Sequence, residues 1–188
     1  VEGAVIAGQF GFNSIELCSA LSSGGLTPNY GLIKQCAHQT SAAVHVMIRH
    51  KEGGFQASEE DIKIMKLDIR AAKEAGADGV VFGILDAENE VDDINKELVE
   101  LAKTLGLKTT FHRAFDFVSD FRASISKILN FGFDRLLTSG LEPKAQTGIK
   151  VIAEIERSWG DKIEVIAGSG VHAGNAMDFS NSGLKYLH

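Results

Sequence analysis

Strand-like and helix-like segments alternate along this sequence from end to end, with only short loops between them. Strands are expected at 14–18, 43–49, 79–85, 108–112, 135–138, 163–167 and 184–188. Helices separate them: the end of one at 1–10, one that begins at Pro28 with Thr27 as its cap, and others at 58–75, 92–105, from Ser119 or Asp120 to Gly132, 143–158 and 173–182. Strict alternation of this kind implies parallel strands joined by right-handed crossovers.

Two architectures satisfy such an alternation, an open doubly wound sheet and a barrel. Parallel strands in an open sheet are buried on both faces and should be almost uniformly apolar. Four strands here instead carry polar residues on one alternating face, as the lumen and mouth of a barrel require. In the strand at 43–49, His45, Met47 and Arg49 alternate with aliphatic residues. We therefore predict one α/β domain over residues 1–188, a TIM-like (β/α) barrel whose first strand and closing helix lie outside this sequence.

The composition narrows the classes of partner. A chain of 188 residues, 44% hydrophobic and 23% charged, suits one domain with a sizeable core. Its formal net charge is −6 and no basic run reaches five residues, so neither nucleic acid nor a membrane surface is expected as a partner. No apolar run approaches the roughly 20 residues of a membrane span. Two distant cysteines make no disulfide framework, which predicts a cytoplasmic location.

Polar and ionisable residues gather at the carboxyl ends of the expected strands, where the chemistry of (β/α) barrels takes place. The opposite strand ends are turn-like or bland. This asymmetry predicts a site at the barrel mouth, and the residues that would share its rim are Glu16, Cys18, Met47, Arg49, His112, Arg113, Asp116, Thr138, Ser139, Ser169 and His188.

The stretch 109–116 is the densest part of this rim, since a strand ends there in three ionisable residues. His112 is a candidate acid/base catalyst with Glu16 as its partner, and Arg113 and Asp116 complete a catalytic set. Arg49 and Arg113 are candidate clamps for an anion. The alternative is an ion-pair network in which the two carboxylates balance the two arginines, and the sequence leaves both possibilities open.

Two glycine turns follow consecutive strands near the end of the chain. They are Ser139-Gly140 and Gly168-Ser169-Gly170. Turns of this kind expose backbone N–H groups, and phosphate commonly binds in this region of barrels. These residues are therefore candidate ligands for an anion. The alternative is that glycine only allows the chain to turn closely.

Several rim residues are soft or imidazole donors, which suit Cu(I) better than Mg²⁺ or Ca²⁺. They are Cys18, Met47, His112 and His188. No close-spaced ligand motif connects them, so ordinary packing inside the barrel is the alternative for Cys18 and Met47.

Six motifs together resemble the CutC copper homeostasis family. They are Ile-Glu-Leu-Cys (15–18), Gly-Gly-Leu-Thr-Pro (24–28), Val-His-Val-Met-Ile-Arg (44–49), Gly-Ala-Asp-Gly-Val-Val-Phe-Gly (76–83), Thr-Phe-His-Arg-Ala-Phe-Asp (110–116) and Leu-Thr-Ser-Gly (137–140). The resemblance implies an incomplete TIM-like barrel, a cytoplasmic homo-oligomer (dimer or tetramer) and a role in copper handling. It implies no settled reaction. Cys18 matches a cysteine proposed to bind Cu(I), and the second such cysteine would lie in the first strand, outside this sequence.

The chain departs from the family pattern at two places. The usual Pro-Arg-Gly-Gly-Asp-Phe is replaced by residues 50–55, His-Lys-Glu-Gly-Gly-Phe, and a usual Gly-Gly-Gly-Val by residues 168–171, Gly-Ser-Gly-Val. His188 matches the first residue of a terminal His-x-Ser motif. We expect a Cu(I) site formed by Cys18, Met47 and His188. The alternative is a barrel enzyme that acts on a small anionic substrate, such as a phosphorylated one, by acid/base chemistry.

Overall fold

The computed structural model describes residues 1–188 and contains seven strands whose order in the sheet is their order in the sequence. Neighbouring strands pair in parallel, for example with Ile15 opposite Val44 and Leu136 opposite Val165. Sequential parallel order with intervening helices is the strand order of a (β/α) barrel, so the predicted fold class is confirmed. The strands are β1 (Ser14–Leu17), β2 (Ala43–Met47), β3 (Gly79–Phe82), β4 (Lys108–Phe111), β5 (Arg135–Thr138), β6 (Glu164–Ala167) and β7 (Tyr186–Leu187).

Seven α-helices connect or precede the strands, and each falls within or close to a segment predicted as helical. Two short 3₁₀ helices, which were not predicted, lie just after β1 and β4. The helices are α1 (Glu2–Gln9), η1 (Leu21–Ser23), α2 (Tyr30–Gln39), α3 (Glu59–Glu74), α4 (Ile94–Thr104), η2 (Arg113–Phe117), α5 (Phe121–Phe131), α6 (Ala145–Trp159) and α7 (Ala176–Asn181). No helix has both the length and the apolar character needed to cross a membrane.

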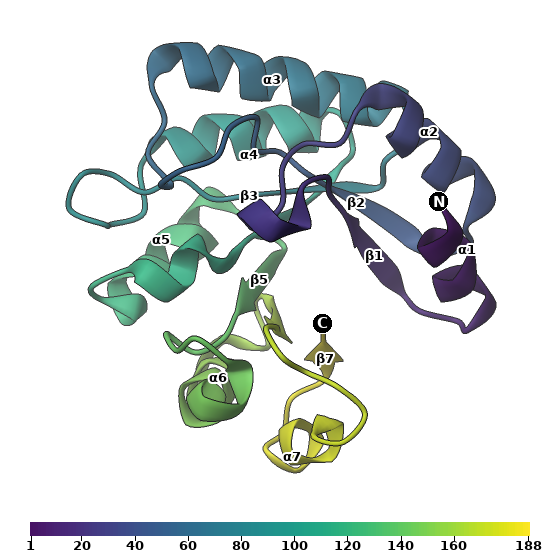
Figure 1. Ribbon diagram of the computed structural model, residues 1–188. Helices are drawn as coiled ribbons and strands as arrows, with labels where there is room; N and C mark the ends of the chain where they lie inside the picture. Colours follow the sequence, from purple (N-terminus) through teal and green to yellow (C-terminus); the bar gives the residue numbers. More distant parts are fainter. The chain divides into compact units, whose positions relative to one another are not determined.

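The chain forms two compact units, which are described separately. The first unit comprises residues 1–82 and 96–109 and includes β1, β2 and β3. In this unit α2, α3 and α4 lie on one side of β2 and β3 (Figure 1). The second unit comprises residues 83–95 and 110–188, with β5, β6, β7 and the helices α5, α6 and α7.

Side chains cap the starts of α3, α5 and α2, and the cap of α2 is not the predicted residue. Ser58 and Asp61 form a capping box at the start of α3, and Asp120 caps α5 by accepting from two backbone N–H groups. Thr27, however, does not cap the helix that follows it. The cap of α2 is Asn29, whose Oδ1 accepts from Leu32 N at 2.9 Å, because the Thr27 hydroxyl is already used at the end of β2.

Most strands are shorter at their carboxyl ends than predicted, because loop atoms replace the ladder partners there. After β2, the backbone N–H of Arg49 donates to Thr27 Oγ1 at 2.8 Å. After β3, the N–H of Ile84 donates to the side chain of the fully buried Asn95 at 3.0 Å. The backbone therefore leaves the sheet early without leaving these donors unpaired.

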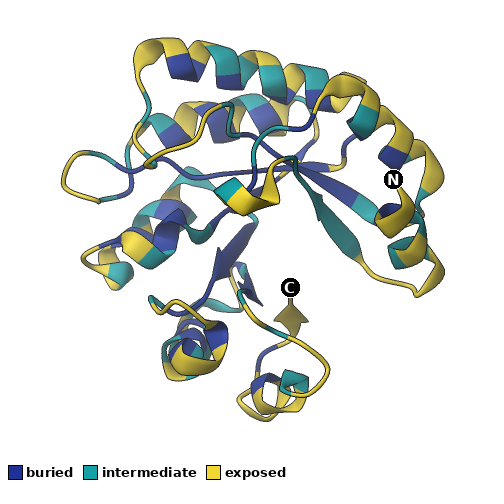
Figure 2. Ribbon diagram, viewed as in Figure 1, coloured by how far each residue is buried: buried dark blue, intermediate teal, exposed yellow.

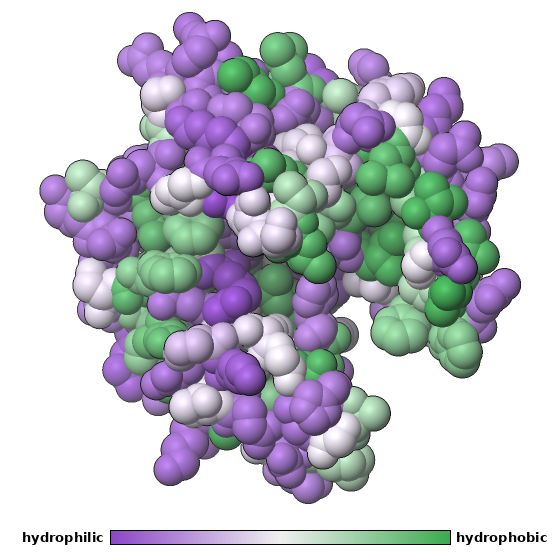
Figure 3. Space-filling view, viewed as in Figure 1, coloured by the Kyte–Doolittle hydropathy of each residue, from purple (hydrophilic) through white to green (hydrophobic).

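The cores of the two units are aliphatic and aromatic. β2, β3 and β5 are largely buried, whereas β1 is of intermediate exposure along its length (Figure 2). Hydrophobic residues also reach the surface around α1 and the start of β1 (Figure 3). Among them are Val1, Ile6, Phe10 and Phe12.

Candidate functional site

Cys18 and Met47 meet at Gly25 in the first unit. β1 and β2 pair in parallel up to Leu17 and Val46, so the residues that follow these two emerge at the same sheet edge. A carbon placed as Cβ on Gly25 would lie 3.4 Å from Cys18 Sγ and 3.5 Å from Met47 Cε. Gly25 is buried and has φ +92°, a conformation that favours glycine. Two sulfur-bearing side chains therefore border one buried point of the backbone.

The Cys18 thiol is kept protonated by its surroundings. Burial raises the pKa of the Cys18 thiol above its ordinary value, and the nearby Glu16 carboxylate raises it further. Because a thiolate is the form that binds soft metals, a cation that binds here has to displace the proton.

Arg49 points its guanidinium at backbone carbonyl oxygens of two loops. Nη1 donates to Ser23 O at 2.9 Å and to Gly25 O at 3.3 Å, and Nη2 donates to Gly53 O at 2.7 Å. The guanidinium carbon lies 5.6 Å from the centre of the Phe55 ring. All three hydrogen-bond acceptors are neutral, so these contacts do not balance the positive charge of the side chain. The guanidinium connects residues 19–26, here called the Cys18 loop, to residues 50–57.

The 50–57 loop is also fastened to the start of α3. Asp61 accepts from Lys51 Nζ at 2.5 Å, from Ser58 N at 2.8 Å, and lies 2.9 Å from His50 Nε2. The hydrogen bond from Lys51, followed by those from Ser58, holds the pKa of the Asp61 carboxyl well below its usual range. These three contacts fix the base of a loop whose tip bonds to Arg49.

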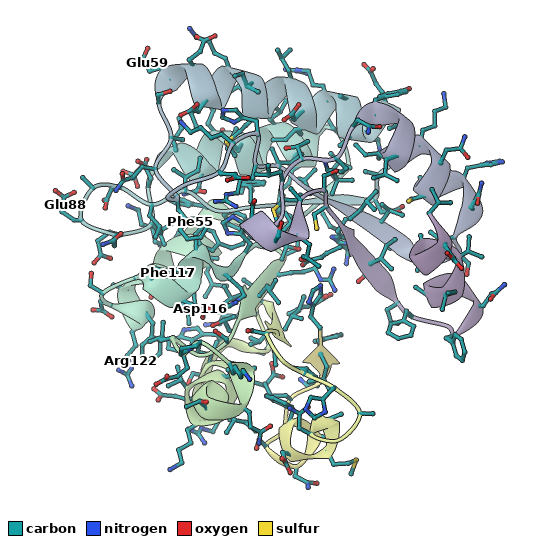
Figure 4. The ribbon with its side chains drawn as sticks, in the orientation of Figure 1. Phe55, Glu59, Glu88, Asp116, Phe117 and Arg122 are labelled. Carbon is teal, nitrogen blue, oxygen red and sulfur yellow. The ribbon has the colours of Figure 1, made fainter.

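In the second unit, the carboxylate of Asp116 is the centre of a dense polar cluster. It accepts from Arg113 Nε at 2.8 Å, Thr138 Oγ1 at 2.5 Å, Ser139 Oγ at 2.8 Å, and the backbone N–H groups of Ser139 at 3.0 Å and Leu141 at 3.2 Å. Its side chain is 3% exposed, and in Figure 4 it lies beside β5. Two of the residues expected to bind an external anion, Arg113 and Ser139, thus donate to an anion of the chain itself, as in the ion-pair alternative raised from the sequence.

His112 is buried and held in one orientation. Its Nδ1 accepts from Ala114 N at 3.2 Å, so the neutral ring carries its proton on Nε2. Gly83 makes room for the ring, because a Cβ there would lie 2.8 Å from Nδ1. Glu16, its predicted partner, belongs to the first unit, so an acid/base pair of these two residues stays a prediction.

The glycine turns are shaped by close packing. Gly140 has φ +73°, and a Cβ there would overlap the carbonyl oxygen of Gly148 in α6. Ser169 has φ +84° and donates from its hydroxyl to Pro143 O at 2.8 Å. A Cβ on Gly168 would lie 2.6 Å from Leu137 Cδ1. These contacts favour the structural role for the turns, and anion binding by Ser169 or Gly170 stays a prediction.

The structure therefore gathers several of the predicted rim residues into two groups, one within each unit. Cys18, Met47 and Arg49 form the first, and Arg113, Asp116, Ser139 and Gly140 form the second. His188 is exposed at the end of β7 in the second unit, where its N–H donates to Ala167 O at 2.8 Å, and its place in a metal site stays a prediction. No three His, Cys, Asp or Glu side chains are grouped so as to hold a metal ion.

Two contributors were missed by the analysis of the sequence. Gly25 was named only within the motif at 24–28, and Leu141 was not singled out although it adopts φ +64°. A Gly-Gly pair six and seven residues after Cys18 was a signal for the first. No feature of the sequence indicated the second.

A family model describes the whole chain. The model for the CutC family matches residues 1–188. This chain belongs to the CutC family. It is 42% identical over 180 residues to a CutC family protein of Vibrio parahaemolyticus, covering 95% of this chain and 73% of the relative. It is also 42% identical over 190 residues to one from Photobacterium profundum, with 100% and 77% covered.

Solved structures agree with this assignment. The chain superimposes on the crystal structure of a candidate copper homeostasis protein CutC from Streptococcus agalactiae with a TM-score of 0.84 and 34% identity, covering 94% of this chain and 87% of that one. A deoxyribose phosphate aldolase from Aeropyrum pernix shares the fold alone, with a TM-score of 0.68 and 17% identity over 98% of this chain and 76% of that one.

Proposed function

We propose that this CutC family protein takes part in copper homeostasis by binding Cu(I) at the carboxyl ends of β1 and β2. The observation that carries the proposal is the convergence of Cys18 Sγ and Met47 Cε on Gly25. A thiol and a thioether are the donors that Cu(I) prefers. The naming of the Streptococcus agalactiae relative as a candidate copper homeostasis protein supports the same assignment. Copper would be cargo here, and the residues that would hold it are Cys18 and Met47, with His188 as a predicted third ligand.

Cys18 supplies the charge that balances the cation. Because burial and Glu16 raise the pKa of the thiol, Cu(I) competes with a proton for the sulfur, and one proton is released for each ion bound. Met47 is 8% exposed, so its thioether lies in a largely dry environment. Such surroundings favour a soft, weakly hydrated cation over a hard one.

Titration of Cu(I) against a chromogenic chelator tests the proposal. Cys18→Ser should lose most of the affinity of the wild type, and Met47→Leu, which conserves volume, should lose part of it. The matched control is Cys36→Ser, because Cys36 is fully buried in α2 and should not bind the ion. Equal Cu(I) affinity of the wild type and Cys18→Ser would exclude the proposed site.

One observation favours a second function, an enzyme that acts on a small anionic substrate. None of the three acceptors of Arg49 balances its positive charge, because all are neutral carbonyls. This supports binding of a carboxylate or phosphate ester at Arg49, and an acid/base role of His112, which belongs to the second unit, stays a prediction. The test is turnover of phosphosugars and carboxylates by the wild type and by His112→Gln. A complete screen without turnover by the wild type would reject the enzyme.

We also propose a cytoplasmic location and a homo-oligomeric state. Their support is the family assignment and a cysteine content that suits a reducing compartment. Light scattering coupled to size-exclusion chromatography would measure the mass, and a monomer at micromolar concentration would contradict the oligomer. Fractionation of cells that produce the protein would test the location.

A further inference from the structure

The Cys18 loop closes directly behind the thiol. Ser19 N donates to Leu26 O at 2.9 Å and Leu26 N donates to Ser19 O at 2.8 Å, so the two ends of the loop are paired at the residue after Cys18. Inside the loop, Gly25 is packed against both Cys18 and Met47. The loop therefore covers one side of Cys18, which is of intermediate exposure, and it has to move if a ligand is to reach the thiol from this side.

The Cys18 loop is held by the side chain of Arg49, which lies two residues after the end of β2. Arg49 donates from one nitrogen, Nη1, to two carbonyls of the Cys18 loop, those of Ser23 and Gly25. Its other terminal nitrogen bonds to Gly53 in the 50–57 loop. A planar guanidinium can serve these acceptors at once because its donors point in fixed directions, whereas a lysine ammonium is a compact point charge on a flexible stem.

A second contact joins the same two loops. The hydroxyl of Ser23 donates to Glu52 at 2.5 Å. The 50–57 loop is itself fixed to α3 through Asp61. The Cys18 loop is thus fastened to a firmly held neighbour at its tip, through Ser23, and next to the thiol, through Gly25.

We propose that Arg49 is a positioning residue that keeps the Cys18 loop closed over Cys18 and Met47, and so controls how fast a soft metal or thiol reagent reaches them. Release of the guanidinium from the Ser23 and Gly25 carbonyls frees the loop, while the ladder between β1 and β2 stays intact. The identity of the natural ligand rests on the proposed function, but the closure itself does not.

The test is the rate at which iodoacetamide alkylates Cys18, followed by mass spectrometry in the wild type, Arg49→Lys and Arg49→Gln. The lysine variant keeps the positive charge, so a change in its rate reports access and not electrostatics. Losing two loop hydrogen bonds should raise the rate about tenfold in both variants. The matched control is Arg122→Lys, because Arg122 also stacks on an aromatic ring and pairs at the surface, but in α5.

Cys36 serves as an internal reference, because it is fully buried and reacts only when the fold opens. Faster alkylation of Cys18 with an unchanged rate at Cys36 would support the proposal. Unchanged Cys18 rates in both Arg49 variants, or equal rises at Cys18 and Cys36, would overturn it.

A milder variant keeps the test decisive if both Arg49 variants fold poorly. Ser23→Ala retains the carbonyl that Arg49 uses and removes only the bond to Glu52. Its Cys18 rate should lie between those of the wild type and Arg49→Lys, and a rate equal to that of the wild type would contradict the fastening of the loop. Cu(I) titration of the wild type is read separately. Faster alkylation without Cu(I) binding would reject the proposed function and leave the role of Arg49 standing.

Discussion

In each of the two units a charged side chain holds a loop that follows a strand, but the two side chains carry charges of opposite sign. In the first unit the cation Arg49 is held by backbone carbonyls of two loops. In the second unit the anion Asp116 is held by backbone N–H groups and hydroxyls of the turn after β5. The difference lies in compensation, because Asp116 also pairs with Arg113 at 2.8 Å whereas the hydrogen-bond acceptors of Arg49 are neutral.

This difference predicts different mechanical behaviour. A buried carboxylate with five donors leaves its partners unsatisfied if it is removed, so the turn in the second unit should be rigid. Arg49 is only partly buried and donates to neutral carbonyls, and water can take over its hydrogen bonds to them. The loops of the first unit should therefore open more easily. The unit with the sulfur donors is therefore the one whose loops are better suited to admit a ligand.

Asp116→Ala should be the most damaging change. It leaves Arg113 and several backbone and hydroxyl donors without their acceptor, and we expect a loss of about 3–5 kcal/mol in the free energy of unfolding. The measurement is denaturation in urea. Asp120→Ala is the control, since Asp120 is an exposed cap that serves two N–H groups and its loss should cost about 1 kcal/mol. If the two variants lose the same stability, Asp116 does not organise its unit.

A pair of glycine substitutions compares the two loops directly. Gly140→Ala should cost about 3 kcal/mol, because φ is +73° and the new methyl group would overlap the backbone of α6. Gly24→Ala, at φ +83°, should cost about 1 kcal/mol, because its nearest neighbour is the mobile end of Arg49 at 3.5 Å. Thermal or urea denaturation measures both. Equal losses would show that the two loops are packed alike.

The sequence was sufficient to predict the architecture, because it depends on local periodicity and spacing. The sequence left open whether Arg113 and Asp116 belong to an ion-pair network or to a catalytic set, because their spacing of three residues permits both. The hydrogen bonds that Thr138 and Ser139 donate to Asp116 were not predictable in detail. They depend on how the segment after β4 and the turn after β5 lie against each other.

The predicted cap of α2, Thr27, was wrong because two residues near the start of this helix are suited to cap it. Thr27 and Asn29 are both good caps, and only the position of Arg49 N decides that the threonine hydroxyl is used elsewhere. The same limit applied to Gly25. Its spacing indicated a turn, but the contact with Cys18 and Met47 arises from the path of the Cys18 loop back to the sheet edge.

Arg49→Gln should cost about 1–2 kcal/mol, less than the loss of Asp116, because the acceptors it leaves without a donor are neutral carbonyls, and those of Ser23 and Gly53 can bind water. Urea denaturation of this variant beside Arg122→Gln provides the measurement, and the exposed pair of Arg122 should contribute at most about 0.5 kcal/mol. In Figure 4 the side chain of Arg122 points away from the ribbon. A loss at Arg49 as large as that at Asp116 would remove the distinction between the two units.

Glu16→Gln should have the smallest effect, and its readout is the reactivity of the Cys18 thiol. The Glu16 carboxylate raises the pKa of Cys18, second to burial, so its neutralisation should lower that pKa without restoring the ordinary value. Because the thiolate is the reactive form, the alkylation rate at neutral pH should rise modestly, and the profile of rate against pH should move to lower pH. Glu59→Gln is the control, since Glu59 is exposed at the start of α3. A profile that stays in place would mean that burial alone sets the Cys18 pKa. Access through the Arg49-held loop would then be the main control on the thiol.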